Sequence, residues 1–241
     1  MAINIDNVYQ RVLALANKEQ RGYITPQEFN LFANQAQMEI FEQYFYDVNQ
    51  FRRIPGNDTV YSDVDDMLEE KLQIFEAVDG PTVVAAYAGA GGGGINKQLP
   101  DYIYRLSRVE FNQANCEIMN TKDFNDIHQG GPLLTPTDDR PVVNIRSNIM
   151  RCRAAGGNLV TPTGVFYFRA PATVSWAYFI VGSKALFDGS SAAVVHFELH
   201  ASEETELIYK ILKFAGISMR RDDIMKAGQG LENAQVSQEK Q

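Results

Sequence analysis

The sequence contains little cysteine and has no long apolar run. Cys116 and Cys152 are the two cysteines among 241 residues. They are too few and too far apart in sequence for a disulfide framework or a zinc site, so we expect two unpaired thiols in a reducing compartment. No stretch approaches the ~18 consecutive apolar residues of a membrane span, and residues 1–7 lack the basic and apolar regions of a secretion signal. We therefore expect a soluble chain that is neither exported nor membrane-bound.

A basic excess is also missing. The chain carries 22 Lys and Arg residues against 30 Asp and Glu residues, which gives a net charge of -8. Proteins that hold nucleic acid by neutralising phosphates need a cationic face, so tight DNA binding is disfavoured. Folding a chain of this length buries roughly 70% of the unfolded surface, so the core needs no metal or disulfide as a staple. One large domain or two small ones is expected.

The N-terminal part shows helical periodicity. Apolar residues recur at helical spacing over residues 5–17, which predicts a first amphipathic helix. Thr25, Pro26 and Glu28 then form a helix start: Thr25 is an N-cap, Pro26 needs no N–H partner there, and Glu28 completes a capping box. The apolar pattern that follows predicts one long helix ending at about Phe51.

Two further helices are predicted. One begins at Ser62, an N-cap followed by acidic residues that suit the positive end of a helix dipole. The other begins at Ser202 and ends at Gly216, a residue type common just after helix ends. The polar residues 226–241 are expected to form a weak helix or a tail that orders on a partner.

Short strands are predicted between these helices. Turn residues recur about every ten positions, and a glycine-rich run at 89–94 predicts a loop or an arm that orders on contact. The candidate strands are residues 82–87, 102–111, 116–119, 142–145, 149–153, 165–169, 174–181 and 193–199. We therefore predict an α+β protein in one compact unit. Its divisions are a helical part (1–75 and 200–225), a β-rich part that is sandwich- or barrel-like (76–199), and a polar tail (226–241).

Two segments imitate ligand-binding loops. Residues 17–28 have EF-hand spacing, but Arg21 occupies a position where calcium needs an oxygen, and Glu28 is explained as a capping residue. The glycine run at 89–94 lacks the Gly-Lys-Ser/Thr ending of a phosphate loop, and Pro100 would break the helix that must follow. Neither calcium nor phosphate binding is expected.

Residues for metal binding or catalysis are not arranged in a usable pattern. His196 and His200 lie on a predicted strand, where four residues span about 13 Å, too far to bind one zinc ion. The acidic cluster at 63–70 is explained as the first turns of a helix, and His128 is expected in a loop without a nucleophile beside it. We predict no catalytic residue, no cofactor and no metal, and hence no enzyme.

The order of elements resembles a known class of viral proteins. Its features are a long aromatic helix, a short acidic-capped helix, a Leu-Pro-x-Tyr start of the strands, short strands and a closing helix before a polar tail. This pattern is similar to the head-to-tail connector proteins of tailed bacteriophages, and most similar to the adaptor or ring proteins of the neck in short-tailed and crAss-like phages. The residues that carry the resemblance are 17–30, 99–105, 167–171, 197–202 and 208–216.

The resemblance implies a structural virion protein. Such proteins form a ring of identical subunits, commonly twelve, beneath the portal, and they contact neighbouring ring or tail proteins. DNA would pass through the ring without tight binding, which suits a negative net charge. The chain would belong to the virion neck between capsid and tail, and to the host cytoplasm during assembly.

Surplus aromatic residues predict where subunits meet. The end of the long helix holds more aromatic side chains than one helix face can bury, which is typical of subunit interfaces. The start of the polar tail adds apolar residues that could order on a neighbour. The candidate interface residues are Phe41, Tyr44, Phe45, Tyr46, Phe51, Ile224, Met225 and Leu231.

A different class of function stays open. Eleven tyrosines, and Trp176 on a predicted strand, would suit sugar stacking in a β-rich binding module of tail-fibre or carbohydrate-binding type, with a helical oligomerisation element. Against this reading, the predicted helices bracket the strands at both ends of the chain, whereas a stem and a receptor domain form separate blocks.

Overall fold

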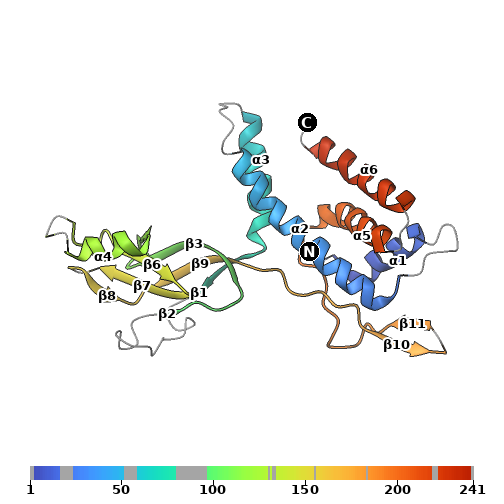
Figure 1. Cartoon of the computed structure of the whole chain (residues 1–241), viewed down its shortest axis with the longest axis horizontal. Helices are drawn as coiled ribbons and strands as arrows, with labels where there is room; N and C mark the ends of the chain where they lie inside the picture. Colours follow the sequence, from blue (N-terminus) through green and yellow to red (C-terminus); the bar gives the residue numbers. More distant parts are fainter. Residues whose placement is uncertain are drawn as a thin grey trace. The chain divides into compact units, whose positions relative to one another are not determined.

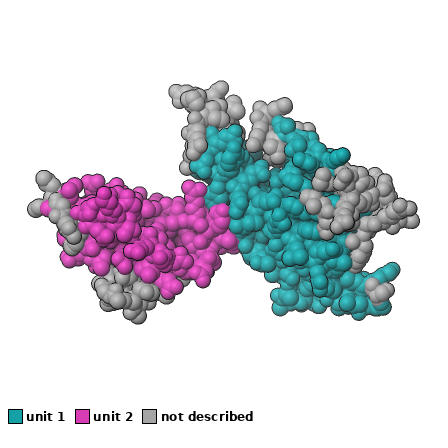
Figure 2. All heavy atoms as spheres, in the orientation of Figure 1, with its two compact units in different colours: residues 1–74, 171–241 teal, residues 75–170 magenta. Residues whose placement is uncertain are grey.

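The computed structural model describes residues 3–16, 24–51, 59–79, 97–129, 131, 134–154, 156–182, 184–218 and 222–239. The chain is α+β, as predicted (Figure 1). It divides into two compact units, coloured separately in Figure 2. Unit 1 comprises Met1–Ile74 and Pro171–Gln241, and unit 2 comprises Phe75–Ala170.

Unit 1 contains five α-helices among its described residues. Buried apolar side chains from α1, α2, the extended segment after residue 171 and α5 form its core, including Ile5, Phe29, Trp176, Phe197 and Leu207. The predicted first and long helices are confirmed. The helices are α1 (Ile5–Ala16), α2 (Pro26–Phe51), α3 (Thr59–Gln73), α5 (Glu204–Ser218) and α6 (Asp222–Glu239).

The predicted capping box begins α2. The Thr25 backbone N–H donates to Glu28 Oε2 at 3.0 Å, and the Glu28 N–H donates to Thr25 Oγ1 at 3.3 Å. The Thr25 hydroxyl also donates to Glu28 Oε2 at 2.7 Å. The hydroxyl and backbone N–H bonds to its carboxylate lower the pKa of Glu28, and the capping box satisfies donors that the first helical turn leaves open. Residues 17–23 of the EF-hand-like segment lie outside the described residues.

Other helix ends differ from the prediction. Helix α3 begins at Thr59, before Ser62. A 3-10 helix, η2 (Ala201–Glu203), precedes α5, and its N-cap is His200 rather than Ser202. Gly216 is buried inside α5, which continues to Ser218, so it is not the helix stop.

A long extended segment of unit 1 replaces two predicted strands. Within 174–181, regular pairing is confined to β10 (Tyr178–Val181), which forms a hairpin with β11 (Lys184–Phe187). Residues 193–199 make two isolated bridges, Ser175 with Val195 and Ile3 with Phe197, in place of a strand. In the structure the β-rich unit ends at Ala170 rather than at 199, because Pro171 and the residues after it belong to unit 1.

The described residues of unit 2 form two open sheets that share one core. The first has the antiparallel order β1 (Glu76–Asp79), β9 (Gly164–Arg169), β3 (Ile103–Phe111) and β4 (Ala114–Asn115). The second has the order β2 (Lys97–Gln98), β7 (Ile149–Ala154), β6 (Val142–Arg146) and β5 (Glu117–Met119), and β8 (Asn158–Val160) also pairs with β7. Side chains from both sheets meet in one cluster that includes Val109, Val143, Met150 and Tyr167. The barrel alternative is wrong, because each sheet has edge strands at both ends among the residues that the structure describes.

Five described elements of unit 2 were not predicted: the short strands β1, β2, β4 and β8, and one helix. Helix α4 (Thr121–Gln129) contains His128, which was expected in a loop. Asn120 begins the helix: its Oδ1 accepts from the Asp123 N–H at 2.9 Å, and its Nδ2 donates to the Asp123 carboxylate at 2.6 Å. The predicted strand 82–87 and the glycine run 89–94 lie outside the described residues.

Candidate interaction surfaces

The aromatic residues predicted to form an interface differ in their exposure to solvent. Phe41 and Tyr44 are buried in unit 1 itself, so they are not available to a partner while the unit is folded. Phe45 is half-buried and packs edge-to-face on Phe41, with ring centroids 5.1 Å apart. Tyr46 is 65% exposed. The side chain of Phe51 lies outside the described residues.

The predicted polar tail is mostly helix α6, which packs on α5. Gly228 is buried, and a Cβ atom placed there would lie 3.1 Å from the Lys213 backbone N and 3.3 Å from the Tyr209 carbonyl oxygen. Glycine is therefore what allows the close approach of the two helices. Leu231 is exposed on α6, and the side chains of Ile224 and Met225 lie outside the described residues.

A buried ion-pair network joins the same two helices. Lys210 Nζ lies 2.7 Å from Glu232 Oε1 and 3.3 Å from Glu206 Oε1, and Lys213 Nζ lies 3.0 Å from Glu232 Oε2. Burial lowers the pKa of Lys210, but the hydrogen bond and the two carboxylates outweigh it and the net pKa is raised. Burial raises the pKa of Glu232, but the two lysines outweigh it and the net pKa is lowered. The network therefore links the polar segment α6 to α5.

Amide side chains of α2 hold the extended segment of unit 1. Asn30 accepts from the Trp176 N–H at 2.9 Å, and Asn34 accepts from the Val174 N–H at 2.8 Å. Gln37 donates to the Ala172 carbonyl at 2.9 Å. Because residues 30, 34 and 37 recur at helical spacing, one face of α2 pairs with alternate residues of the segment much as a neighbouring strand would.

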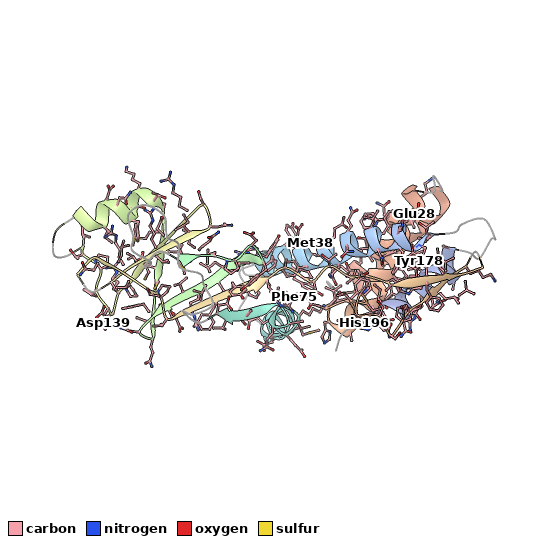
Figure 3. All side chains as sticks on the ribbon, turned by 90° about the horizontal axis from the view of Figure 1, so that it is seen from below. Glu28, Met38, Phe75, Asp139, Tyr178 and His196 are labelled. Carbon is pink, nitrogen blue, oxygen red and sulfur yellow. The ribbon has the colours of Figure 1, made fainter. Side chains whose placement is uncertain are left out.

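Trp176 fixes the start of the β10–β11 hairpin. The side chain is 2% exposed, its Nε1 donates to Asp6 Oδ1 at 3.0 Å, and its ring lies 4.4 Å from that of Tyr9. Tyr178 and Phe187, the paired residues at the base of the hairpin, stack on it at 5.8 and 5.7 Å. Tyr178 is labelled in Figure 3. The base of the hairpin is therefore held by α1 and α2.

Beyond this base, the hairpin exposes apolar side chains on both faces. Ile180 is 70% exposed, and Phe179, Val181 and Leu186 are also exposed. Figure 1 shows β10 and β11 extending from the helices of unit 1. The sequence contains a local signal for this hairpin: two apolar runs, 176–181 and 185–187, are separated by Gly-Ser-Lys, and Gly182 has a φ of 60° in the turn.

Unit 2 carries a hollow between β5 and α4. Its volume is about 500 Å³. Four of its lining residues are apolar and three are acidic, and Ile118 is 53% exposed there. The lining residues are Glu117, Ile118, Met119, Asn120, Asp123, Asp126, Ile127 and Leu134.

The histidines singled out from the sequence have local structural roles. His196 Nδ1 accepts from the Ile5 N–H at 3.4 Å, and His200 Nδ1 accepts from the Ser202 N–H at 3.3 Å. Among the described residues, His, Cys, Asp and Glu side chains form no group of three that could hold a metal ion. Within the same residues, the helices are all too short or too polar to cross a membrane.

The two cysteines, distant in sequence, lie side by side in the core of unit 2. Their Sγ atoms are 3.6 Å apart, and both thiols are free and buried. The hydrogen bond from Cys152 lowers the pKa of Cys116, and the same contact together with burial raises the pKa of Cys152. Sequence separation was therefore a poor guide to their distance.

The sequence was also compared with known proteins. No family model matches it, and neither does any curated protein. An inference about function therefore rests on the surfaces described above.

Proposed function

We propose that this chain is a structural virion protein of a bacteriophage neck, which forms a ring of identical subunits under the portal and connects capsid to tail. The β10–β11 hairpin is the observation that carries the proposal. It presents Phe179, Ile180 and Val181 to solvent on a base that is firmly packed. Exposed apolar side chains on a fixed projection are typical of protein–protein contact sites.

The construction of the hairpin supports a role in assembly. A two-stranded hairpin is marginally stable in water and gains stability from a further strand or a packing partner. Here the base packs on Trp176, whereas the outer part carries apolar groups on both faces. A single anchored hairpin is pre-organised, so a partner does not have to supply the free energy that orders it.

The charge of the chain is compatible with a DNA conduit. A net charge of -8 opposes firm contacts with phosphate, which would retard DNA that slides through a ring. In this proposal the partners are other copies of the chain, commonly twelve in all, the portal protein, and neighbouring ring or tail proteins. The subunits assemble from the host cytoplasm into the virion neck.

The sugar-binding alternative loses its main residue. Trp176 is 2% exposed, and both its ring and its indole N–H are engaged within unit 1. A side chain in this position cannot stack on a sugar without unfolding the base of the hairpin. We therefore do not propose carbohydrate binding as a second function.

Electron microscopy tests the proposal. The full chain is mixed with the portal ring of the same virus, and particles are compared with portal rings alone. We expect an added layer with the rotational symmetry of a ring under each portal. Portal rings that gain no layer at high concentrations of the chain would contradict the proposal.

A further inference from the structure

We propose that the β10–β11 hairpin of one copy binds in the hollow between β5 and α4 of the next copy. This contact rests on the proposed ring function and names the surfaces that would build the ring. It uses two features that the folds of the separate units leave exposed, one on unit 1 and one on unit 2.

The hairpin has the side-chain pattern of an inserting element. Tyr178 pairs with Phe187 at the base, and Ile180 pairs with Ala185 two residues further out. Phe179 and Val181 therefore lie on one face of the hairpin, and Ile180 lies on the other. A surface with exposed apolar groups on both faces buries more of them by entering a hollow than by lying on a flat surface.

The hollow offers matching chemistry. Ile118, Met119, Ile127 and Leu134 supply its apolar lining, and about 500 Å³ is within the range of sites that bind ligand groups. The hollow therefore has the volume and the apolar surface to take several side chains of the hairpin tip.

Charge favours the same pairing. Lys184 is the one charged residue of the sequence between 178 and 187, and it is exposed beside the turn. Three lining residues of the hollow, Glu117, Asp123 and Asp126, are acidic. The Arg140 guanidinium lies 3.4 Å from the Glu117 carboxylate. Both side chains are largely exposed, so this ion pair is weak. A hairpin tip with apolar side chains and one lysine thus matches a hollow lined by apolar and acidic residues.

Backbone pairing can add to the contact. Strand β5 is the last strand of its sheet among the described strands, and it lines the hollow. Strands β10 and β11 each also have one edge that pairs with no other strand among the described residues. An added strand gives affinity through main-chain hydrogen bonds, while pockets for alternate side chains give specificity.

The two surfaces differ from each other, so the contact is heterologous. Each copy offers one hairpin and one hollow, and a chain of such contacts closes into a ring when the rotation between copies permits. This geometry is what the proposed function requires. A second copy of this chain is therefore the occupant that we infer for the hollow.

Self-association of the full chain tests the contact. Sedimentation velocity is measured up to the highest soluble concentration for the wild type, for Ile180→Glu and for Leu31→Glu. Leu31 is the control, because it is 71% exposed and belongs to α2 rather than to the hairpin. We expect Ile180→Glu to weaken association about tenfold or more, which is about 1.4 kcal/mol, and Leu31→Glu to leave it unchanged. Equal association of both variants and the wild type would overturn the contact.

A charge exchange tests the pairing itself. Lys184→Glu and Asp126→Lys are each expected to weaken association roughly twofold to fivefold, as for exposed ion pairs. The double variant Lys184→Glu/Asp126→Lys is expected to recover most of the loss. A double variant no better than the sum of its single changes would overturn the assignment of Lys184 to this hollow.

Cross-linking separates contacts between copies from contacts within one copy. A photoreactive residue at position 180 is activated in a mixture of isotopically light and heavy chains. We expect mixed light–heavy products that join position 180 to residues 117–134. Products confined to one isotope would overturn the contact, as would a chain that stays monomeric at all concentrations. Neither result bears on whether rings form on a portal, which the microscopy above tests separately.

Discussion

Asn34 holds the backbone of Val174 in both directions. Its Oδ1 accepts from the Val174 N–H at 2.8 Å, and its Nδ2 donates to the Val174 carbonyl at 3.0 Å. Val174 is buried, so both backbone groups would lack a water partner without this amide. The Asn34 side chain thus makes the two backbone hydrogen bonds that a neighbouring strand would otherwise make with the segment leading to the hairpin.

Removing this amide should destabilise unit 1. Asn34→Ala leaves a buried N–H and a buried C=O without partners, which we expect to cost about 3 kcal/mol. Urea unfolding followed by the fluorescence of Trp176, the single tryptophan, measures the loss in unit 1. Asn49→Ala is the control, because its amide donates to the Phe45 carbonyl on the exposed side of the same helix, and we expect a change within about 0.5 kcal/mol. Equal losses in both variants would contradict the role given to Asn34.

Two glycines of α6 test the α5–α6 contact. Gly228→Gln places a side chain against the backbone of Lys213 and Tyr209, so α6 must move away, at an expected cost of about 2 kcal/mol. Gly230→Gln meets nothing within 4 Å and should gain up to about 0.8 kcal/mol of helix propensity. Urea unfolding and hydrogen exchange of the α6 amides measure both effects. Similar results for the two variants would show that α6 does not pack on α5 as described.

The ion pairs of Glu232 predict an acid-sensitive contact. Its pKa is lowered in the folded chain, so its stabilisation is present above the usual pKa of a glutamate and is lost as the pH falls through the lowered value. We expect Glu232→Gln to lose about 2 kcal/mol at pH 7, because two charged hydrogen bonds are weakened. The difference from the wild type should shrink in acid. Glu70→Gln, an exposed change on α3, should show neither effect.

The capping box predicts a smaller effect. Thr25→Ala removes an acceptor for the Glu28 N–H and a donor to its carboxylate, and should cost about 1 kcal/mol. Thr25→Ser keeps the hydroxyl and should retain most of the stability. Because the hydroxyl bond to its carboxylate lowers the pKa of Glu28, this part of the difference between the two variants is expected above the usual glutamate pKa and should decline as the pH falls through the lowered value. Thermal unfolding at two pH values measures it.

Local signals allowed the helical part and much of unit 2 to be predicted. The capping box at Thr25 depends on residues three positions apart, so the start of α2 could be read directly. Strands β6, β7 and β9 are apolar or alternating runs next to turns, and their prediction is confirmed within a residue or two at each end. In these elements the local pattern and the tertiary packing agree.

Long-range contacts explain what could not be predicted. Asn34 and Gln37 look like surface residues of a helix, and nothing local indicates that they bind a segment about 140 residues away. That binding moves residues 171–199 into unit 1. Helix α4 has two apolar residues, Phe124 and Ile127, in nine positions, which is too few to form a repeating helical pattern in the sequence. The candidate surface was likewise missed, because burial of Phe41 and Tyr44 and exposure of Ile180 are decided by tertiary packing.

The composition of purified virus particles tests the central claim most directly. Quantitative mass spectrometry compares the copy number of this chain with that of the portal protein in the same particles. We expect the chain to be present at about the stoichiometry of the portal, as a neck ring requires. Absence of the chain from mature particles would contradict the account.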